Sequence, residues 1–223
     1  MELLEGLRTT GAVRSFRPDP VPDDVVRRLL DTARFAPNGG NAQSWHVVVL
    51  RDAAVRASVR DLYLDGWRRY VAATAAGLRP WAPLTDVARE REVMDAGFDG
   101  PVGDFAEHFD EVPLLLVVCA DLRKLAAIDR DLDRYSMVGG ASVYPFVWSV
   151  LLAAREEGLG GVITTMPIWR EPELRSLLAV PDTHAVAAVV ALGVPEHQPT
   201  KLRREGVESF TTVDRFDGPA LDG

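Results

Sequence analysis

The chain is poor in cysteine, in histidine and in long apolar stretches. Its 223 residues include one cysteine, Cys119, and four histidines. A single cysteine allows no intrachain disulfide, which excludes a disulfide-stapled secreted fold and suits the reducing cytoplasm. The longest apolar runs reach about eight residues, far below the roughly 20 that a membrane helix needs. Met1–Glu5 also lacks the basic and apolar regions of a signal peptide. We therefore predict a cytoplasmic protein that does not enter membranes.

Positive charge is also scarce. The 25 lysine and arginine residues are outnumbered by 33 aspartate and glutamate residues, which gives a net charge of −8. This balance argues against non-specific nucleic-acid binding and against binding to anionic membrane surfaces. The hydrophobic fraction of 47% is ordinary for a globular protein. The length predicts one domain over residues 1–223 with a large core.

Apolar spacing predicts strands that alternate with helices. Continuous apolar runs indicate buried strands at 45–50, 114–120, 162–165 and 184–192. Helices are expected from Pro22 to Pro37, over 52–70, over 143–157 and from Glu171. The fold class is therefore α+β, a mixed α/β domain. The 143–157 helix is apolar on all sides, so it must be covered on every face, in the core or at a subunit interface. The polar segment 195–223 is expected to be a C-terminal arm.

The usual catalytic and metal-binding patterns are missing. The spacing Asp129-x-Asp131-x-Asp133 imitates a calcium loop, but Arg134 and Gly140 occupy its obligatory Gly and Glu positions. We interpret these aspartates as a solvated acidic helix face. The histidines have no metal-ligand spacing, and Cys119 lies in a predicted core strand, where thiols are usually inert. No metal site and no catalytic side chain is therefore predicted.

Three polar features remain. The first is the stretch from Arg8 to Phe16, which reads Arg-Thr-Thr-Gly-Ala-Val-Arg-Ser-Phe. The second is the loop 36–45, Ala-Pro-Asn-Gly-Gly-Asn-Ala-Gln-Ser-Trp, which offers backbone amides and three side-chain amides before a strand. The third is the cationic run Lys201-Leu202-Arg203-Arg204 in the arm. Each alone has an ordinary explanation as surface charge or a turn, and their occurrence together in this order is informative.

In this order the motifs resemble those of the FMN-dependent nitroreductase family. The similarity extends from about residue 5 to 204 and includes the Gly158-Leu159-Gly160-Gly161 turn and the Ala191-Leu192-Gly193 strand end. The resemblance implies a central mixed β-sheet flanked by helices, in an intertwined homodimer with C-terminal arm exchange. It also implies that FMN lies at the dimer interface, between residues of both subunits.

The resemblance assigns a role to each matching position. Arg8, Thr9 and Thr10 would hold the FMN phosphate and ribityl chain, and Arg14 would lie near the pyrimidine side of the flavin. The loop beside the flavin would consist of Pro37, Asn38, Gly39, Gly40, Asn41 and Gln43. The segment over the N5 atom of the flavin would contain Thr164 and Thr165. Two further basic residues, Lys201 and Arg203, would bind the phosphate. Two departures stand out, because Gly11-Ala12 looks like an insertion and Thr164-Thr165 replaces the Glu-Gly of many members.

The implied activity is reduction of nitroaromatic, quinone or related flat acceptors, with NADH or NADPH as electron donor in a ping-pong cycle. This agrees with the absence of an acid, base or nucleophile cluster. Aromatic residues are concentrated in 62–112, which we predict to form a lid or substrate pocket. Trp67, Phe105 and Phe109 are the expected substrate contacts.

Two other functions remain open at this point. The first is an FMN-dependent dehydrogenase, oxidase or dehalogenase that acts on a pathway-specific substrate. The second is a flavin-binding protein without turnover. The sequence does not separate them, and it also leaves the physiological acceptor open.

Overall fold

The computed structural model describes residues 1–221 and is built around a four-stranded sheet with the order β1-β2-β4-β3. The strands are β1 (Trp45–Leu50), β2 (Leu114–Asp121), β3 (Gly160–Thr164) and β4 (His184–Gly193). All three strand pairs are antiparallel. The expected mixed sheet is therefore wrong for the described strands, in which parallel pairing is limited to an isolated bridge between Ala12 and Gly161.

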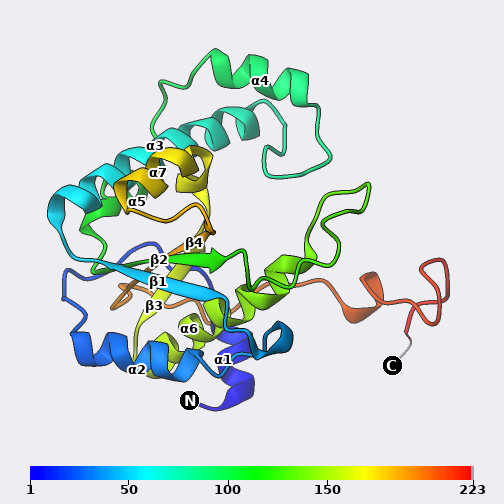
Figure 1. Cartoon of the computed structure of the whole chain (residues 1–223), viewed down its shortest axis with the longest axis horizontal. Coiled ribbons are helices and arrows are strands. Elements are labelled where there is room, and N and C mark those ends of the chain that lie inside the picture. Colours follow the sequence, from blue (N-terminus) through cyan, green and yellow to red (C-terminus); the bar gives the residue numbers. More distant parts are fainter. Residues whose placement is uncertain (222–223) are drawn as a thin grey trace.

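Helices cover both faces of this sheet (Figure 1). On one face α2 (Asp23–Ala33) and α6 (Tyr144–Glu156) form one core cluster with the sheet, and α1 (Leu3–Thr9) lies against α6. On the other face α3 (Ala53–Ala75), α5 (Asp104–Glu107) and α7 (Glu171–Leu177) form the second cluster. The helix α4 (Val87–Asp95) packs outside α3. Short 3-10 turns lie at Gly39–Asn41, Phe109–Glu111, Val138–Ser142, Met166–Arg170 and Val207–Ser209.

The strands form where the sequence is apolar on both faces. Every residue of β2 is buried, because helices cover both of its sides. The start of β3 differs from the expectation, since Gly160 and Gly161 belong to the strand and not to the preceding turn. A Cβ on Gly161 would lie 2.5 Å from the Ala191 carbonyl oxygen, so glycine permits this close pairing with β4.

The helix starts follow local chemistry. Pro22 precedes α2 and two aspartates lie in its first turn, as expected for the positive end of a helix dipole. The Asp52 carboxylate caps α3 by accepting from the amides of Ala54 and Val55, both at 2.9 Å. This helix continues to Ala75, beyond the expected end near Tyr70.

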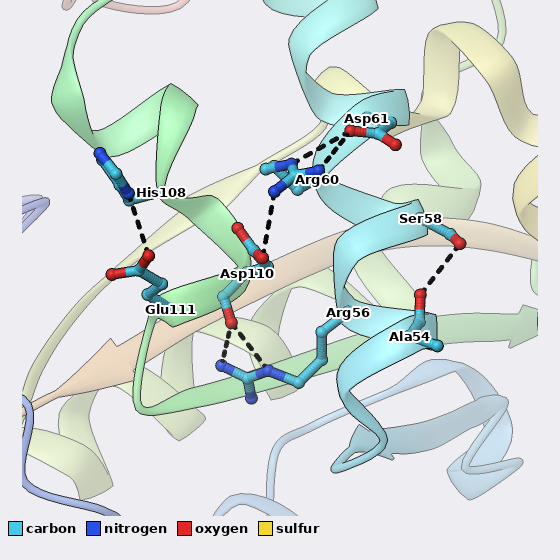
Figure 2. A network of polar contacts seen from close by, with 8 residues as sticks. All are labelled: Ala54, Arg56, Ser58, Arg60, Asp61, His108, Asp110 and Glu111. Carbon is cyan, nitrogen blue, oxygen red and sulfur yellow. Dashed lines mark hydrogen bonds and ion pairs between the residues drawn. The ribbon is translucent and has the colours of Figure 1, made fainter.

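A partly buried guanidinium fastens α3 to the turn that leads into β2 (Figure 2). Arg56 donates to the Asp110 carbonyl oxygen from Nε at 2.9 Å and from Nη2 at 2.6 Å. It also donates to the carbonyl oxygens of Val112 and Leu50. Burial lowers the pKa of Arg56 from its usual value, and the Asp110 charge opposes that shift, while the carbonyl oxygens satisfy its N–H groups.

Arg56→Met is expected to lower the free energy of unfolding by about 2–4 kcal/mol, because several buried carbonyl oxygens lose a charged donor. The matched control is Arg60→Met on the same helix, whose guanidinium forms partly exposed ion pairs with Asp61 and Asp110. That variant should lose less than about 1 kcal/mol. Urea denaturation of both variants measures the difference, and equal losses would contradict the assignment.

Candidate functional site

The N-terminal motif and the C-terminal arm meet beside β3. Residues 12 and 13 pair with Gly161, and the Val13 amide donates to its carbonyl oxygen at 2.9 Å. On the other side Phe16 bridges Pro195, and Gln198 Nε2 donates to the Thr9 carbonyl oxygen at 3.4 Å. A Cβ on Gly11 would lie 2.8 Å from the Leu202 side chain. Thr9 and Gln198, which are 189 positions apart in the sequence, are thus in contact.

Four cations belong to the two segments that form this junction. Arg8, Arg14, Lys201 and Arg203 are all exposed. Within residues 1–221 none of the four forms an ion pair. Other exposed arginines do form ion pairs, for example Arg28 with Asp24 and Glu157. Unpaired cations on segments from both chain ends that meet in a net-acidic protein favour a small anionic ligand such as a phosphate.

Buried polar atoms at the same junction lack a partner. In the described part of the chain, Thr10 Oγ1, Gln198 Oε1 and Arg155 Nε are buried without a hydrogen bond. Thr10 is only 8% exposed. Buried polar groups are normally satisfied, so unpartnered ones indicate a ligand or bound water. The donors and acceptors match what a phosphate and a polyhydroxyl chain require, and FMN carries both.

Thr164 and Arg14 meet at a buried tyrosine that the sequence analysis missed. Tyr63 of α3 is 1% exposed, and burial raises the pKa of its hydroxyl to about 12. The nearby Arg14 charge and the Thr164 side chain oppose that rise in pKa. Thr165 is exposed next to them. A tyrosine on a helix gives no sequence signal for this role, because the contact is made only in the tertiary structure.

The loop 37–43 has a fixed shape. The Asn38 side chain accepts from the Gln43 amide at 2.8 Å and donates to the Ala36 carbonyl oxygen at 3.1 Å. Gly40, Asn41 and Gln43 adopt positive φ angles of 59°, 52° and 47°. A Cβ on Gly39 would lie 2.6 Å from Ala126 Cβ, so this glycine lets the loop pack against the segment that follows β2.

The loop and the N-terminal motif lie at opposite ends of α6. Gly39 approaches Ser142, just before that helix begins, whereas Thr9 contacts Arg155 near its end. The 13 residues of α6 span about 20 Å. Within one chain, the contacts therefore do not join Asn38 and Asn41 to the four cations, whereas Pro37 lines the same groove as Gly6 of α1.

The predicted substrate aromatics pack against one another. Tyr63 stacks on Phe109 at 4.2 Å between ring centroids and on Trp67 at 6.1 Å, and Phe105 meets Phe109 edge-on at 5.5 Å. Trp67 Nε1 donates to the Val102 carbonyl oxygen at 2.6 Å. Phe109 has no exposed surface, so it cannot contact a substrate in this arrangement, while Trp67 and Phe105 are half-buried.

The interpretation of Asp129 as part of a solvated helix face is wrong. Residues 122–137 contain no helix, and Asp129 is 2% exposed. Its carboxylate accepts from Arg134 Nη1 at 2.7 Å, Ser136 Oγ at 3.0 Å and the amides of Met137 and Val138 at 2.9 and 3.2 Å. These hydrogen bonds hold the pKa of Asp129 well below its ordinary value, the Met137 amide contributing most.

Acid should therefore weaken the protein through this carboxylate. Because the folded state lowers its pKa, its stabilisation is complete above the unfolded-state pKa of about 3.9 and is lost as the pH falls below it. We expect Asp129→Asn to unfold at a lower temperature than the wild type at pH 7, with a gap that narrows towards pH 3. Calorimetry across this range measures the gap, and a gap independent of pH would contradict the assignment.

Other chemistry receives no support from the geometry. Burial raises the pKa of the Cys119 thiol to about 11, which disfavours the nucleophilic thiolate. Across residues 1–221 no group of three or more His, Cys, Asp or Glu side chains is placed to hold a metal ion. None of the helices in that range has the length and hydropathy of a membrane span.

Comparison with known proteins places this architecture in a family. The Nitroreductase family profile matches residues 7–194. An NADH dehydrogenase of Thermus thermophilus is 30% identical over 189 residues, which cover 84% of this chain and 83% of that protein. A 5,6-dimethylbenzimidazole synthase of Rhodospirillum rubrum is 30% identical over 209 residues, covering 88% and 84%. A crystal structure of iodotyrosine deiodinase bound to FMN and 3-iodo-L-tyrosine superposes with a TM-score of 0.65 at 24% identity, covering 92% and 96%. The chain belongs to the nitroreductase family of oxidoreductases.

Proposed function

We propose that this protein is an FMN-dependent oxidoreductase that uses NADH or NADPH to reduce nitroaromatic, quinone or related flat acceptors. The observation that carries the proposal is the junction of the two chain ends, whose segments carry four unpaired cations and buried polar atoms without partners. One turnover with a quinone would convert NAD(P)H, a proton and the quinone into NAD(P)⁺ and the hydroquinone.

The residues at the junction bind and orient the cofactor in this proposal. Arg8, Lys201 and Arg203 neutralise the phosphate, while Thr10 supplies a hydroxyl to the ribityl chain. Arg14 faces the pyrimidine side, where its charge favours the electron-rich form of the ring. When bound, FMN would supply two-electron transfer chemistry between NAD(P)H and the acceptor. Protons can come from solvent, which is why no acid or base cluster is needed.

The segment that carries Thr164 and Thr165 is held in place by α3. A Cβ on Gly66 would lie 2.2 Å from the Met166 carbonyl oxygen, so the helix backbone touches this segment directly. Tyr63 of the same helix lies close enough to Thr164 for that side chain to lower the pKa of its hydroxyl. The contact with α3 would hold Thr164 and Thr165 in place beside the reactive centre of the flavin.

We also propose a homodimer in which two copies complete each site. The accessible surface of 13609 Å² exceeds the value of about 10,000 Å² for a compact monomer of this mass. Leu3 of α1 and Phe35 are 70% and 75% exposed and line a mainly apolar groove of about 420 Å³. The arm projects away from the body (Figure 1). Its residues 222–223 lie outside the described residues. A partner would cover these surfaces and bring its loop 37–43 to the junction.

The visible spectrum of the purified protein tests the cofactor, and anaerobic stopped-flow tests the reaction. We expect the absorption of oxidised flavin and its rapid bleaching by NADPH or NADH. Sedimentation analysis should give the mass of two chains. A colourless protein that does not bind added FMN would overturn the proposal, and a monomer that binds FMN would overturn the shared site.

The names of two relatives favour a second candidate function. An iodotyrosine deiodinase and a 5,6-dimethylbenzimidazole synthase are similar to this chain, so a dehydrogenase, oxidase or dehalogenase of a pathway-specific substrate is the alternative. Such an enzyme would bind FMN but turn over slowly with quinones and nitroaromatics. Bound FMN that neither nicotinamide reduces would favour a flavin-binding protein without turnover.

A further inference from the structure

A second cavity lies on the far side of α6 from the cation junction. It has a volume of about 440 Å³ and lies between the end of β2, the start of α6 and the connection between them. Of the described residues that line it, none is charged, although 26% of the chain is. Its apolar and aromatic lining includes Ala120, Leu125, Ala127, Tyr135, Met137 and Tyr144.

The wall of this cavity is fixed but exposed. Asp129 holds residues 134–138 through its four hydrogen bonds, and the Tyr144 hydroxyl donates to the Ala187 carbonyl oxygen at 3.1 Å. Nevertheless, Tyr135 and Met137 are each 73% exposed and Tyr144 is 45% exposed. An ordered apolar surface left open to water is typical of a binding site.

The cavity adjoins the loop 37–43. The 122–144 connection touches that loop where Gly39 faces Ala126 and Ser142, so the two segments form one rigid edge. If this loop lies beside the flavin of a second copy, as proposed above, then Tyr135 and Met137 lie beside that flavin too. This step rests on the proposed function and on the dimer.

We propose that Tyr135, Met137 and Tyr144 form the acceptor-binding wall for the partner's flavin and select uncharged aromatic acceptors. An aromatic ring gains contact with the phenol and thioether groups. A carboxylate or zwitterion loses hydration and finds no opposite charge in the lining. The wall belongs to residues 122–144, whereas the aromatic residues of 62–112 are mainly engaged with one another.

Substitution of Met137 tests this selectivity. Met137→Arg should raise the KM for nitrobenzene about tenfold and lower the KM for 4-nitrobenzoate, because the new cation can pair with the carboxylate. Met137→Ala should raise the KM for nitrobenzene alone. The control is Leu132→Arg, which adds the same charge to an exposed position of the same segment outside the lining. FMN content should stay unchanged in all three variants, and for Leu132→Arg the rate of flavin bleaching by NADPH should stay unchanged as well.

Mixed dimers test whether the wall acts on the partner's flavin. One subunit carries Met137→Arg and the other carries Arg203→Ala, which weakens FMN binding at its own junction, and FMN is supplied at a concentration that loads only the other site. If the wall acts in trans, the only loaded site has a native wall, and the mixed dimer keeps the nitrobenzene preference of the wild type. A mixed dimer with the preference of Met137→Arg would overturn the trans arrangement.

The outcomes separate this inference from the proposed function. Wild-type protein that binds FMN and is bleached by NADPH, but whose KM values are unaffected by Met137→Arg and Met137→Ala, overturns the wall and leaves the proposed function standing. A wild type that does not bind FMN overturns both.

Discussion

Arg203→Ala is expected to weaken FMN binding by about ten- to a hundredfold, the effect of losing one charge-assisted contact to a phosphate. Arg203 is exposed, belongs to no ion pair in residues 1–221, and follows Leu202, which packs over Gly11. Its removal therefore leaves the fold intact and takes a cation from the junction. Fluorescence titration of the apoprotein with FMN measures the change, and the salt dependence of binding should also decrease.

Arg215→Ala is the matched control. Arg215 lies in the same arm, but its guanidinium is paired with Asp217 at 3.0 Å. The control removes the same charge from the same segment and should leave FMN affinity within about twofold, because surface ion pairs contribute little. Equal losses in both variants would mean that the arm acts through its overall charge, which contradicts a specific role for Arg203.

Gly66→Ala is expected to destabilise the protein by about 1–3 kcal/mol, although alanine is the better helix former. An added Cβ would lie 2.2 Å from the Met166 carbonyl oxygen and 3.0 Å from Trp169 Cδ1. The helix and the 164–170 segment must separate, which moves Thr164 away from the site. We expect both a lower midpoint in urea and weaker FMN retention.

Gly6→Ala provides the comparison, since Gly6 is also a helical glycine. Its added Cβ would meet the Met1 side chain at 2.7 Å, and that flexible end can move. This variant should match or exceed the stability of the wild type, because the gain in helix propensity remains. If Gly66→Ala were equally stable, the close contact between α3 and Met166 would be excluded as a constraint on the site.

Local chemistry explains what could be predicted. The strands β1, β2 and β4 and the helix α6 consist of apolar runs with the correct period, and their predicted bounds agree with the structure to within one or two residues. Gly160 and Gly161 belong to a strand and not to the expected turn. The absence of a Cβ favours glycine both in turns and where two strands approach closely, so the residue type does not separate the two. Asp129 was misread because a charged side chain is usually exposed, and only its hydrogen bonds show that it is buried.

The sequence by itself determined the family, the strands β1, β2 and β4, the helices α2, α3, α6 and α7, and which polar residues are available to hold a phosphate, since these depend on residue type and short-range spacing. Only the tertiary structure decided their arrangement. It joined Thr9 to Gln198, placed the loop 37–43 at the other end of α6, and turned the aromatic residues of 62–112 towards one another. Such contacts depend on how distant segments pack, and one sequence records no trace of which distant residues meet.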